Sequence, residues 1–279
     1  MKIFEINLKE KYEILGDEGR NPTLTCYLPY NLVEMGRADE MRPTMVVCPG
    51  GGYAHCSERE AEPIALKFLN WGFNVFVINY SCAPHRYPVQ LREVAAVFEE
   101  IYKNANDWHC DTKKIGIIGF SAGGHLAAHY SNAYNSDAVR EVFPESKKPS
   151  FSVLCYPVIS AEETLDAHKG SFVNLLGEFP TGDEAHKYSC EKLVSFDTPP
   201  TFVWHTAEDQ VVPVKNSLVY ASALADNKVP FSLRIYPYGV HGLSTVDHLT
   251  LNDDRLDAKT DLAHQWLDDL KAWMDKEIL

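Results

Sequence analysis

The segment Gly119-Phe120-Ser121-Ala122-Gly123 has the G-x-S-x-G spacing that surrounds a nucleophilic serine. It follows an apolar run over residues 114–119, which predicts a buried strand, and it opens a helical pattern that continues to about residue 134. A sharp strand-to-helix turn exposes the serine hydroxyl, and the helix N-terminus offers N–H groups to developing negative charge. A serine that merely caps the helix would fit the same turn. The motif therefore needs partners before it indicates catalysis.

A serine nucleophile requires a histidine base, and the base requires a carboxylate that orients it. Asp209 follows a predicted strand over residues 201–205, and His241 follows the next predicted strand, over residues 231–236. Both lie downstream of Ser121, in the order serine, acid, histidine, each on a loop beyond the carboxyl end of a strand. We predict that Ser121 is the nucleophile, His241 its base and Asp209 the orienting acid.

Other residues compete for these roles. Glu208 is adjacent to Asp209, but Asp209 opens a D-x-x-V-P turn and is the shorter, more easily fixed carboxylate. Asp247 and His248 lie beyond the glycine-flanked loop that carries the predicted base. His205 ends a predicted strand, where we expect a packed or hydrogen-bonded core histidine.

A triple glycine in Pro49-Gly50-Gly51-Gly52-Tyr53 follows a predicted strand over residues 44–48. The spacing is not the G-x-G-x-x-G of dinucleotide sites, and no P-loop lysine follows. We interpret it as an oxyanion loop, in which N–H groups of Gly51 or Gly52, with that of Ala122, stabilise a tetrahedral intermediate. A flexible turn is the alternative.

His125 and His129 have the i, i+4 spacing that places two histidines on one helix face. A zinc protease helix needs glutamate directly after the first histidine, and here that residue is Leu126. We predict no metal site, and the chemistry of a serine hydrolase requires no organic cofactor.

Composition narrows the class of protein. The chain has 279 residues, of which 45% are hydrophobic and 23% charged, and its formal net charge is −13. Such acidity argues against nucleic acid and anionic membrane surfaces as partners. The seven cysteines form no C-x-x-C pair, and no apolar run has the length of a signal peptide core or a membrane span. We expect free thiols and a cytoplasmic protein.

Apolar β-branched runs alternate with amphipathic helical stretches along the chain, which predicts a mainly parallel sheet with helices on both faces. We expect one domain over residues 1–279, with an insertion or lid over residues 158–198. The expected strands are 2–8, 22–28, 44–48, 74–79, 114–119, 151–155, 201–205 and 231–236. The expected helices are 58–71, 88–103, 121–134, 214–226 and 257–276.

Taken together, these segments resemble α/β-hydrolases of the hormone-sensitive-lipase and BD-FAE-like carboxylesterase group, and within it bacterial acetylxylan esterases and sugar-ester hydrolases. The resemblance spans about residues 44–245. The segments that carry it are 49–53, 59–63 (Arg59-Glu60-Ala61-Glu62-Pro63), 84–88 (Pro84-His85-Arg86-Tyr87-Pro88), 119–125 and 199–205. It implies the α/β-hydrolase fold and the same triad and oxyanion donors. One departure is Pro49, where the wider lipase group usually has histidine.

The expected activity is hydrolysis of a small-molecule ester, with a short acyl group, above all acetyl, on a polar or carbohydrate alcohol. The insertion carries many charged residues and no long apolar stripe to line an acyl channel. Tyr53, His85, Arg86 and Tyr87 combine flat faces with hydrogen-bonding tips and are candidates for contact with a sugar ring. The alternatives are a peptidase of the prolyl-oligopeptidase type and a non-catalytic ligand-binding protein on the same fold. The oligomeric state stays open.

Overall fold

The computed structural model describes residues 1–13, 21–252 and 260–279. Within this part of the chain eight strands form one sheet, in the order β1-β2-β4-β3-β5-β6-β7-β8. β2 is antiparallel to both of its neighbours, and all other neighbouring strands are parallel. The strands are β1 (Lys2–Asn7), β2 (Thr23–Leu28), β3 (Arg42–Cys48), β4 (Asn74–Asn79), β5 (Cys110–Phe120), β6 (Phe151–Cys155), β7 (Thr201–Thr206) and β8 (Phe231–Tyr236).

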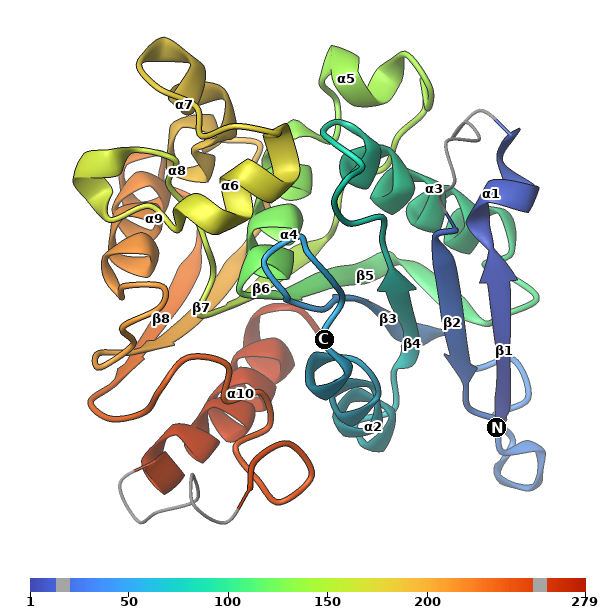
Figure 1. Ribbon diagram of the computed structural model, residues 1–279. Coiled ribbons are helices and arrows are strands. Elements are labelled where there is room, and N and C mark those ends of the chain that lie inside the picture. Colours follow the sequence, from blue (N-terminus) through green and yellow to red (C-terminus); the bar gives the residue numbers. More distant parts are fainter. Residues whose placement is uncertain (14–20, 253–259) are drawn as a thin grey trace.

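Helices cover both faces of the sheet (Figure 1). One face carries α3 (Val89–Lys103), α4 (Ala122–Ala133) and α9 (Lys215–Asp226), and the other carries α2 (Glu62–Asn70) and α10 (Trp266–Glu277). Each face has its own buried apolar cluster, because the central strands are apolar on both sides. None of the described helices is both long and apolar enough to cross a membrane.

The mainly parallel, two-faced sheet is confirmed, with shifts at element ends. The predicted helix 58–71 is interrupted, since Ala61 (φ −107°, ψ −101°) separates the 3-10 turn η3 (Glu58–Glu60) from α2. β5 begins four residues earlier than expected, at Cys110. In the predicted helix 257–276, residues 257–259 lie outside the described residues, and η5 (Thr260–Gln265) precedes α10.

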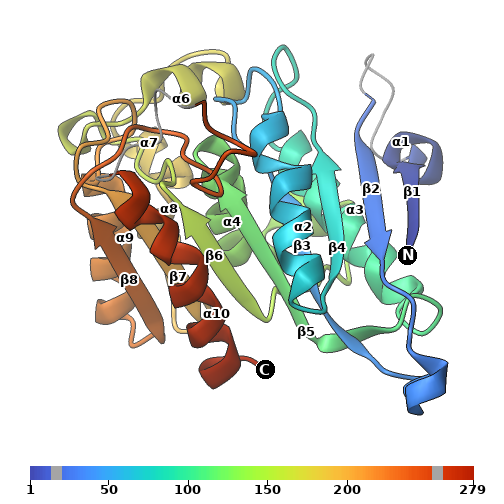
Figure 2. The same cartoon turned by 90° about the horizontal axis from the view of Figure 1, so that it is seen from below.

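The predicted insertion contains helices and no strand over its described residues, 158–198. Its helical segments are η4 (Glu163–Leu165), α6 (Lys169–Leu176), α7 (Asp183–Tyr188) and α8 (Cys190–Leu193). Figure 2 shows α6 and α7 beyond the carboxyl ends of the parallel strands. A small apolar cluster inside the insertion holds Val158, Ala161, Phe172 and Ala185 against Val212.

The connections from β3 and β5 leave the sheet toward opposite faces. β3 continues through α2 to β4 on one side, whereas β5 continues through α4 to β6 on the other. Such a reversal opens a crevice at the carboxyl ends of the two strands, where ligands of parallel sheets bind. The glycine loop after β3 and the serine turn after β5 therefore meet at one place.

Candidate active site

Ser121 forms the sharp turn between β5 and α4. Its φ of 53° and ψ of −118° lie in a region that residues other than glycine rarely adopt. The Ser121 amide donates to Cys155 O at 3.0 Å, and its carbonyl accepts from the amides of His125 and Val158 at 3.1 and 3.0 Å. These backbone bonds hold the strained residue in place.

The two glycines of the motif are required by close backbone approach. A Cβ atom at Gly119 would lie 2.1 Å from Gly123 O, and one at Gly123 would lie 2.2 Å from Cys48 O. Any side chain at either position would therefore separate α4 from β5 or from the end of β3. The G-x-S-x-G spacing thus allows the serine turn to pack directly against the glycine loop.

The structure brings together Ser121, His241 and Asp209, which follow β5, β8 and β7. His241 Nε2 lies 2.8 Å from Ser121 Oγ, and His241 Nδ1 lies 2.6 Å from Asp209 Oδ2. An ionised carboxylate only accepts hydrogen bonds, so Nδ1 carries the ring proton and Nε2 accepts from the serine hydroxyl. The arrangement can deprotonate the serine and keep the resulting imidazolium beside a negative charge.

Asp209 is buried and is held in its ionised form. Burial raises the pKa of this carboxyl, but hydrogen bonds from His205, His241 and the Val212 amide outweigh burial and hold the pKa well below its usual range. Its Oδ1 accepts from the amides of Val211 and Val212, both at 2.9 Å. The D-x-x-V-P turn therefore fixes one carboxylate oxygen and leaves the other for histidine.

His205 is a fully buried histidine that supports this acid. Its Nε2 lies 2.8 Å from Val212 O and 3.2 Å from Asp209 Oδ2, while its Nδ1 lies 2.8 Å from Ser217 Oγ. Because a carbonyl only accepts, Nε2 carries the proton and Nδ1 accepts from the serine. The expectation of a hydrogen-bonded core histidine is confirmed, and the structure adds its contact with Asp209.

The glycine loop after β3 is a turn whose carbonyls are tied back. Gly50 O accepts from Ser57 N at 2.9 Å, and Gly51 O accepts from the amides of Ala54 and His55 at 3.0 and 3.3 Å. In a trans peptide the C=O and the next N–H point in opposite directions, so the amides of Gly51 and Gly52 point away from these bonds. A Cβ at Gly50 would lie 3.1 Å from Ser121 Cβ, so the loop passes directly beside the serine.

Sequence reasoning gave no role to Glu60, a buried carboxylate that joins two loops of the site. Its Oε2 accepts from Gly50 N at 2.8 Å, and its Oε1 accepts from the Tyr156 hydroxyl at 2.7 Å. The same hydroxyl accepts from Ser244 N at 2.9 Å, and the Tyr156 ring packs edge-on against His241 with centroids 5.1 Å apart. Glu60 thus connects the glycine loop to the histidine loop.

Of the residues expected to contact a sugar, Tyr53 is contradicted by its position. It is 1% exposed, and its hydroxyl lies 2.8 Å from His125 Nδ1, so it packs beneath the glycine loop. The aromatic tip found a partner in α4 that the sequence pattern did not indicate. Tyr53 is therefore a core residue and not a substrate contact.

The segment around residues 84–88 packs against the insertion. The Arg86 guanidinium donates to Asn174 O in α6, and the Tyr87 ring stacks on His129 with centroids 5.6 Å apart. His85 is partly exposed. These contacts give Arg86 and Tyr87 structural partners, while contact of His85, Arg86 or Tyr87 with a substrate stays a prediction.

The two histidines of α4, His125 and His129, make contacts in the protein interior. His125 Nδ1 meets the Tyr53 hydroxyl, and its Nε2 lies 2.8 Å from Tyr188 O, so both of its ring nitrogens have partners. His129 is 3% exposed and stacks on Tyr87. Across residues 1–13, 21–252 and 260–279, no group of three or more histidine, cysteine or acidic side chains is placed to hold a metal ion.

The competing residues lie elsewhere. Glu208 is exposed, and His248 is exposed. Asp247 pairs with Lys67, whose Nζ lies 2.9 Å from Asp247 Oδ2. The structure therefore places Asp209, and not these acids, against His241.

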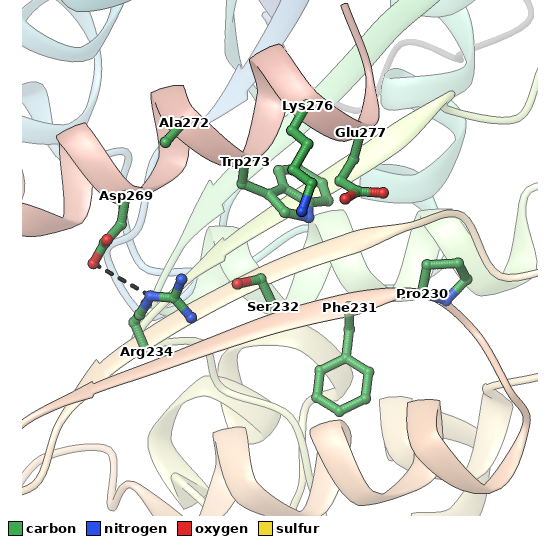
Figure 3. A pocket seen from close by; sticks show the side chains of 9 residues that line it. All are labelled: Pro230, Phe231, Ser232, Arg234, Asp269, Ala272, Trp273, Lys276 and Glu277. Carbon is green, nitrogen blue, oxygen red and sulfur yellow. Dashed lines mark ion pairs between the residues drawn. The ribbon is translucent and has the colours of Figure 1, made fainter.

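A groove of 460 Å³ lies between β8 and α10 and contains none of the residues discussed so far. Figure 3 shows Arg234 and Asp269 facing each other across one end of it, with Arg234 Nε 3.3 Å from Asp269 Oδ2. Trp273 and Lys276 approach it from α10. The groove lies at the edge strand, and neither Ser121 nor His241 lines it, so its size does not mark the site of the expected chemistry.

Comparison with known proteins places the chain in a family. The BD-FAE family model matches residues 31–224. The chain belongs to the BD-FAE family. This confirms the resemblance drawn from the sequence and, with the structural relatives, the α/β-hydrolase fold.

Three relatives of this BD-FAE protein are informative. The chain is 38% identical over 259 residues to an endo-1,4-beta-xylanase B from Butyrivibrio fibrisolvens, an alignment that covers 88% of this chain and 39% of the relative. It is 35% identical over 233 residues to an acetylxylan esterase from Xylanibacter ruminicola, covering 82% of this chain and 45% of the relative. The chain thus spans less than half the length of either curated relative.

The third relative is a solved structure of similar size. It is an acetyl ester-xyloside bifunctional hydrolase from Caldicellulosiruptor lactoaceticus, 35% identical, with a TM-score of 0.78 and 96% of each chain covered.

Proposed function

We propose that this BD-FAE protein is a serine carboxylic-ester hydrolase that works through an acyl-enzyme and removes acetyl groups from a carbohydrate alcohol. The observation that carries the proposal is the continuous hydrogen-bonded chain from Ser121 Oγ through His241 to the buried, ionised Asp209. A serine that only capped the helix would need no histidine partner, and a histidine with a purely structural role would not need to contact this serine.

Acylation begins when Ser121 Oγ attacks the ester carbonyl carbon and its proton passes to His241 Nε2. The negative charge then develops on the carbonyl oxygen, where the amides of Gly51, Gly52 and Ala122 donate to it. As the tetrahedral intermediate collapses, the C–O bond to the alcohol breaks and His241 returns the proton to the leaving oxygen.

Deacylation repeats these steps with water. His241 Nε2 takes a proton from a water molecule, the resulting hydroxide attacks the acetyl carbonyl, and the bond to Ser121 breaks. His241 then gives its proton back to the serine, and acetate leaves. Throughout, Asp209 keeps the Nδ1 proton of His241 in place and stabilises the imidazolium.

Acetylated carbohydrate is the substrate class that the relatives support. One curated relative is an acetylxylan esterase, and one structural relative is an acetyl ester-xyloside hydrolase. The insertion is also mostly polar on its outside, since Glu163, Asp166 and Glu184 are exposed and most of its apolar residues are buried, although Phe196 and Val173 are exposed. A lipase lid would instead present an exposed apolar surface. The relatives support an ester hydrolase over the peptidase and the non-catalytic alternatives, and the mostly polar surface of the insertion supports a polar alcohol over a lipid.

We also propose a cytoplasmic location and a small-molecule ester as the partner. The seven cysteines are all free thiols, as is usual in a reducing compartment. The net charge of −13 supports the expectation that nucleic acid is not a partner.

The first test combines a nucleophile variant with a series of esters. We expect Ser121→Ala to lower kcat by roughly 10⁴-fold or more, because the triad acts as a unit. The variant should keep its circular dichroism spectrum, because alanine removes only the hydroxyl. A folded Ser121→Ala protein with near wild-type turnover would exclude Ser121 as nucleophile.

The ester series tests the acyl group and the alcohol. A real acyl tunnel would raise kcat/KM about fourfold per methylene, since each buried CH₂ contributes about 0.8 kcal/mol. We expect instead that acetyl esters are the best substrates in a series from acetyl to decanoyl, and that acetate is released from acetylated xylo-oligosaccharides. Activity that rises toward decanoyl, with no acetate from the sugar, would contradict the proposed substrate class.

A further inference from the structure

His168 caps the insertion helix α6 with one side of its ring. Its Nδ1 lies 2.8 Å from Ser171 Oγ and accepts from Ser171 N at 3.3 Å. Burial lowers the pKa of His168, and the neighbouring His241 lowers it further, against a smaller opposite effect of Asp209. The ring is therefore neutral at neutral pH. Because Nδ1 accepts the backbone N–H, the single ring proton sits on Nε2.

The capped ring lies at the N-terminal end of α6, a helix that borders the glycine loop. Its partner Ser171 borders the glycine loop, since a Cβ at Gly52 would lie 3.9 Å from Ser171 Oγ. Further along α6, Asn174 Nδ2 donates to Gly52 O at 2.9 Å and ties the helix to this loop. The charges of His241 and Asp209 also act on the His168 ring, so the ring lies near both side chains. His168 is only partly buried, so its ring has an exposed side.

The proton path of the proposed reaction decides which part of a substrate comes near this ring. The carbonyl oxygen must point to the glycine-loop amides, and the leaving oxygen must lie beside His241 Nε2, which protonates it. The alcohol therefore extends past His241. A donor that lies near His241 contacts the alcohol and not the acetyl group.

From this geometry we propose that His168 forms a leaving-group subsite, in which its Nε2–H donates to a hydroxyl or ring oxygen of a polyhydroxylated alcohol. The inference rests on the proposed function and names the residue that recognises the carbohydrate side of the ester. The subsite selects among alcohols because a neighbouring sugar oxygen accepts the hydrogen bond, whereas a plain aromatic alcohol has no acceptor beyond the reacting oxygen.

His168→Asn isolates this donor. Asparagine is among the preferred helix caps, so its side-chain oxygen can still accept from Ser171 N, while the imidazole Nε2–H is lost. His186→Asn is the matched control, because His186 lies in the same insertion, is exposed, and pairs with Glu162. Thermal unfolding of both variants shows whether each keeps the wild-type stability.

The assay compares two acetate esters, phenyl acetate and mono-acetylated xylobiose. Both form the same acetyl-enzyme, so a difference between them in kcat/KM arises in acylation, where the alcohol is still present. We expect His168→Asn to lower kcat/KM for acetylated xylobiose by about 3- to 10-fold, the effect of one hydrogen bond to a neutral group. For phenyl acetate the change should stay below about twofold, and His186→Asn should change neither substrate.

Equal losses of kcat/KM on the two esters, or no loss on either, would overturn the subsite while leaving the esterase intact. Wild-type protein that hydrolyses phenyl acetate but not acetylated xylobiose would overturn it as well. A wild-type protein inactive on both esters would instead refute the proposed function on which the subsite rests. The two failures are therefore distinguishable.

Discussion

Replacing Asp209 with asparagine should reverse the proton position on His241. The amides of Val211 and Val212 both point at Oδ1 from 2.9 Å, so the amide oxygen of asparagine must take that position. Its Nδ2 group then faces His241 Nδ1, where the wild-type carboxylate oxygen lies 2.6 Å away. An N–H donor there requires Nδ1 to be unprotonated. The ring proton moves to Nε2, where it meets Ser121 Oγ.

A histidine in that tautomer cannot accept the serine proton. The same amide substitution in a serine protease lowers kcat about 10⁴-fold, which corresponds to about 5.4 kcal/mol in the activation barrier. We expect a loss of this size in kcat/KM for phenyl acetate. The structure supports the full effect, because His205 Nε2 already donates to Val212 O and offers the asparagine Nδ2 no acceptor.

Glu208→Gln is the matched control, since Glu208 is the adjacent acid and is exposed. It should leave kcat/KM within about twofold of wild type, as expected for a surface position. Unfolding in urea shows whether each variant is folded at the assay temperature. Equal losses for the two variants, or a folded Asp209→Asn protein with activity within tenfold of wild type, would refute the assignment of the acid.

Two further predictions concern residues that support the site. Glu60→Ala removes the carboxylate that accepts from the Gly50 amide and the Tyr156 hydroxyl, so we expect the free energy of unfolding in urea to fall by about 2–5 kcal/mol. The exposed control Glu58→Ala should lower it by less than about 0.5 kcal/mol, and similar changes in the two variants would show that the Glu60 link contributes little. Burial lowers the pKa of His129 in the folded protein to about 3, below its unfolded-state value of about 6.5. The contribution of His129 to the free energy of unfolding is therefore fully present above about pH 6.5 and decreases as the pH falls toward about 3, by about 2 kcal/mol at pH 5. His129→Phe should remove that part of the pH dependence, and urea curves with the same pH slope in both proteins would contradict the assignment.

The strands, and the helices that cover the sheet between them, could be predicted from short-range patterns in the sequence. Runs such as residues 151–155 are mostly apolar without alternation, so they predict strands that are buried between two layers of helices. The predicted helix 58–71 was wrong at its start for a tertiary reason. Glu60 turns inward to Gly50 and Tyr156, and the backbone breaks at Ala61 to allow it. Acidic residues are common in the first turn of a helix, so the sequence pattern gave no sign that Glu60 is buried.

The residues that we propose to carry the chemistry were predictable because local backbone requirements leave a trace in the sequence. Gly119 is needed by its close contact with Gly123, and Gly123 by its close contact with Cys48 at the end of β3; both glycines belong to one short motif, and the acid and the base each follow a strand. Supporting residues leave no such trace. Glu60 and Tyr156 are 96 positions apart, and only the fold brings them together. Tyr53 was misassigned for the same reason, since its partner His125 lies 72 positions away.

The glycine loop is held partly by segments next to the sheet and partly by the insertion. Gly50 is held by Glu60, and Gly51 is held by its own turn, so these two bonds come from segments next to the sheet. Gly52 is instead held by Asn174 of the insertion, at 2.9 Å. The insertion therefore contacts the glycine loop directly and, through His168, also approaches His241. We expect a change in the insertion to alter the end of the glycine loop at Gly52 and the alcohol that fits, whereas the serine turn stays as β5 and α4 place it. For this reason we expect the serine motif to indicate the proposed reaction and the insertion to influence which ester undergoes it.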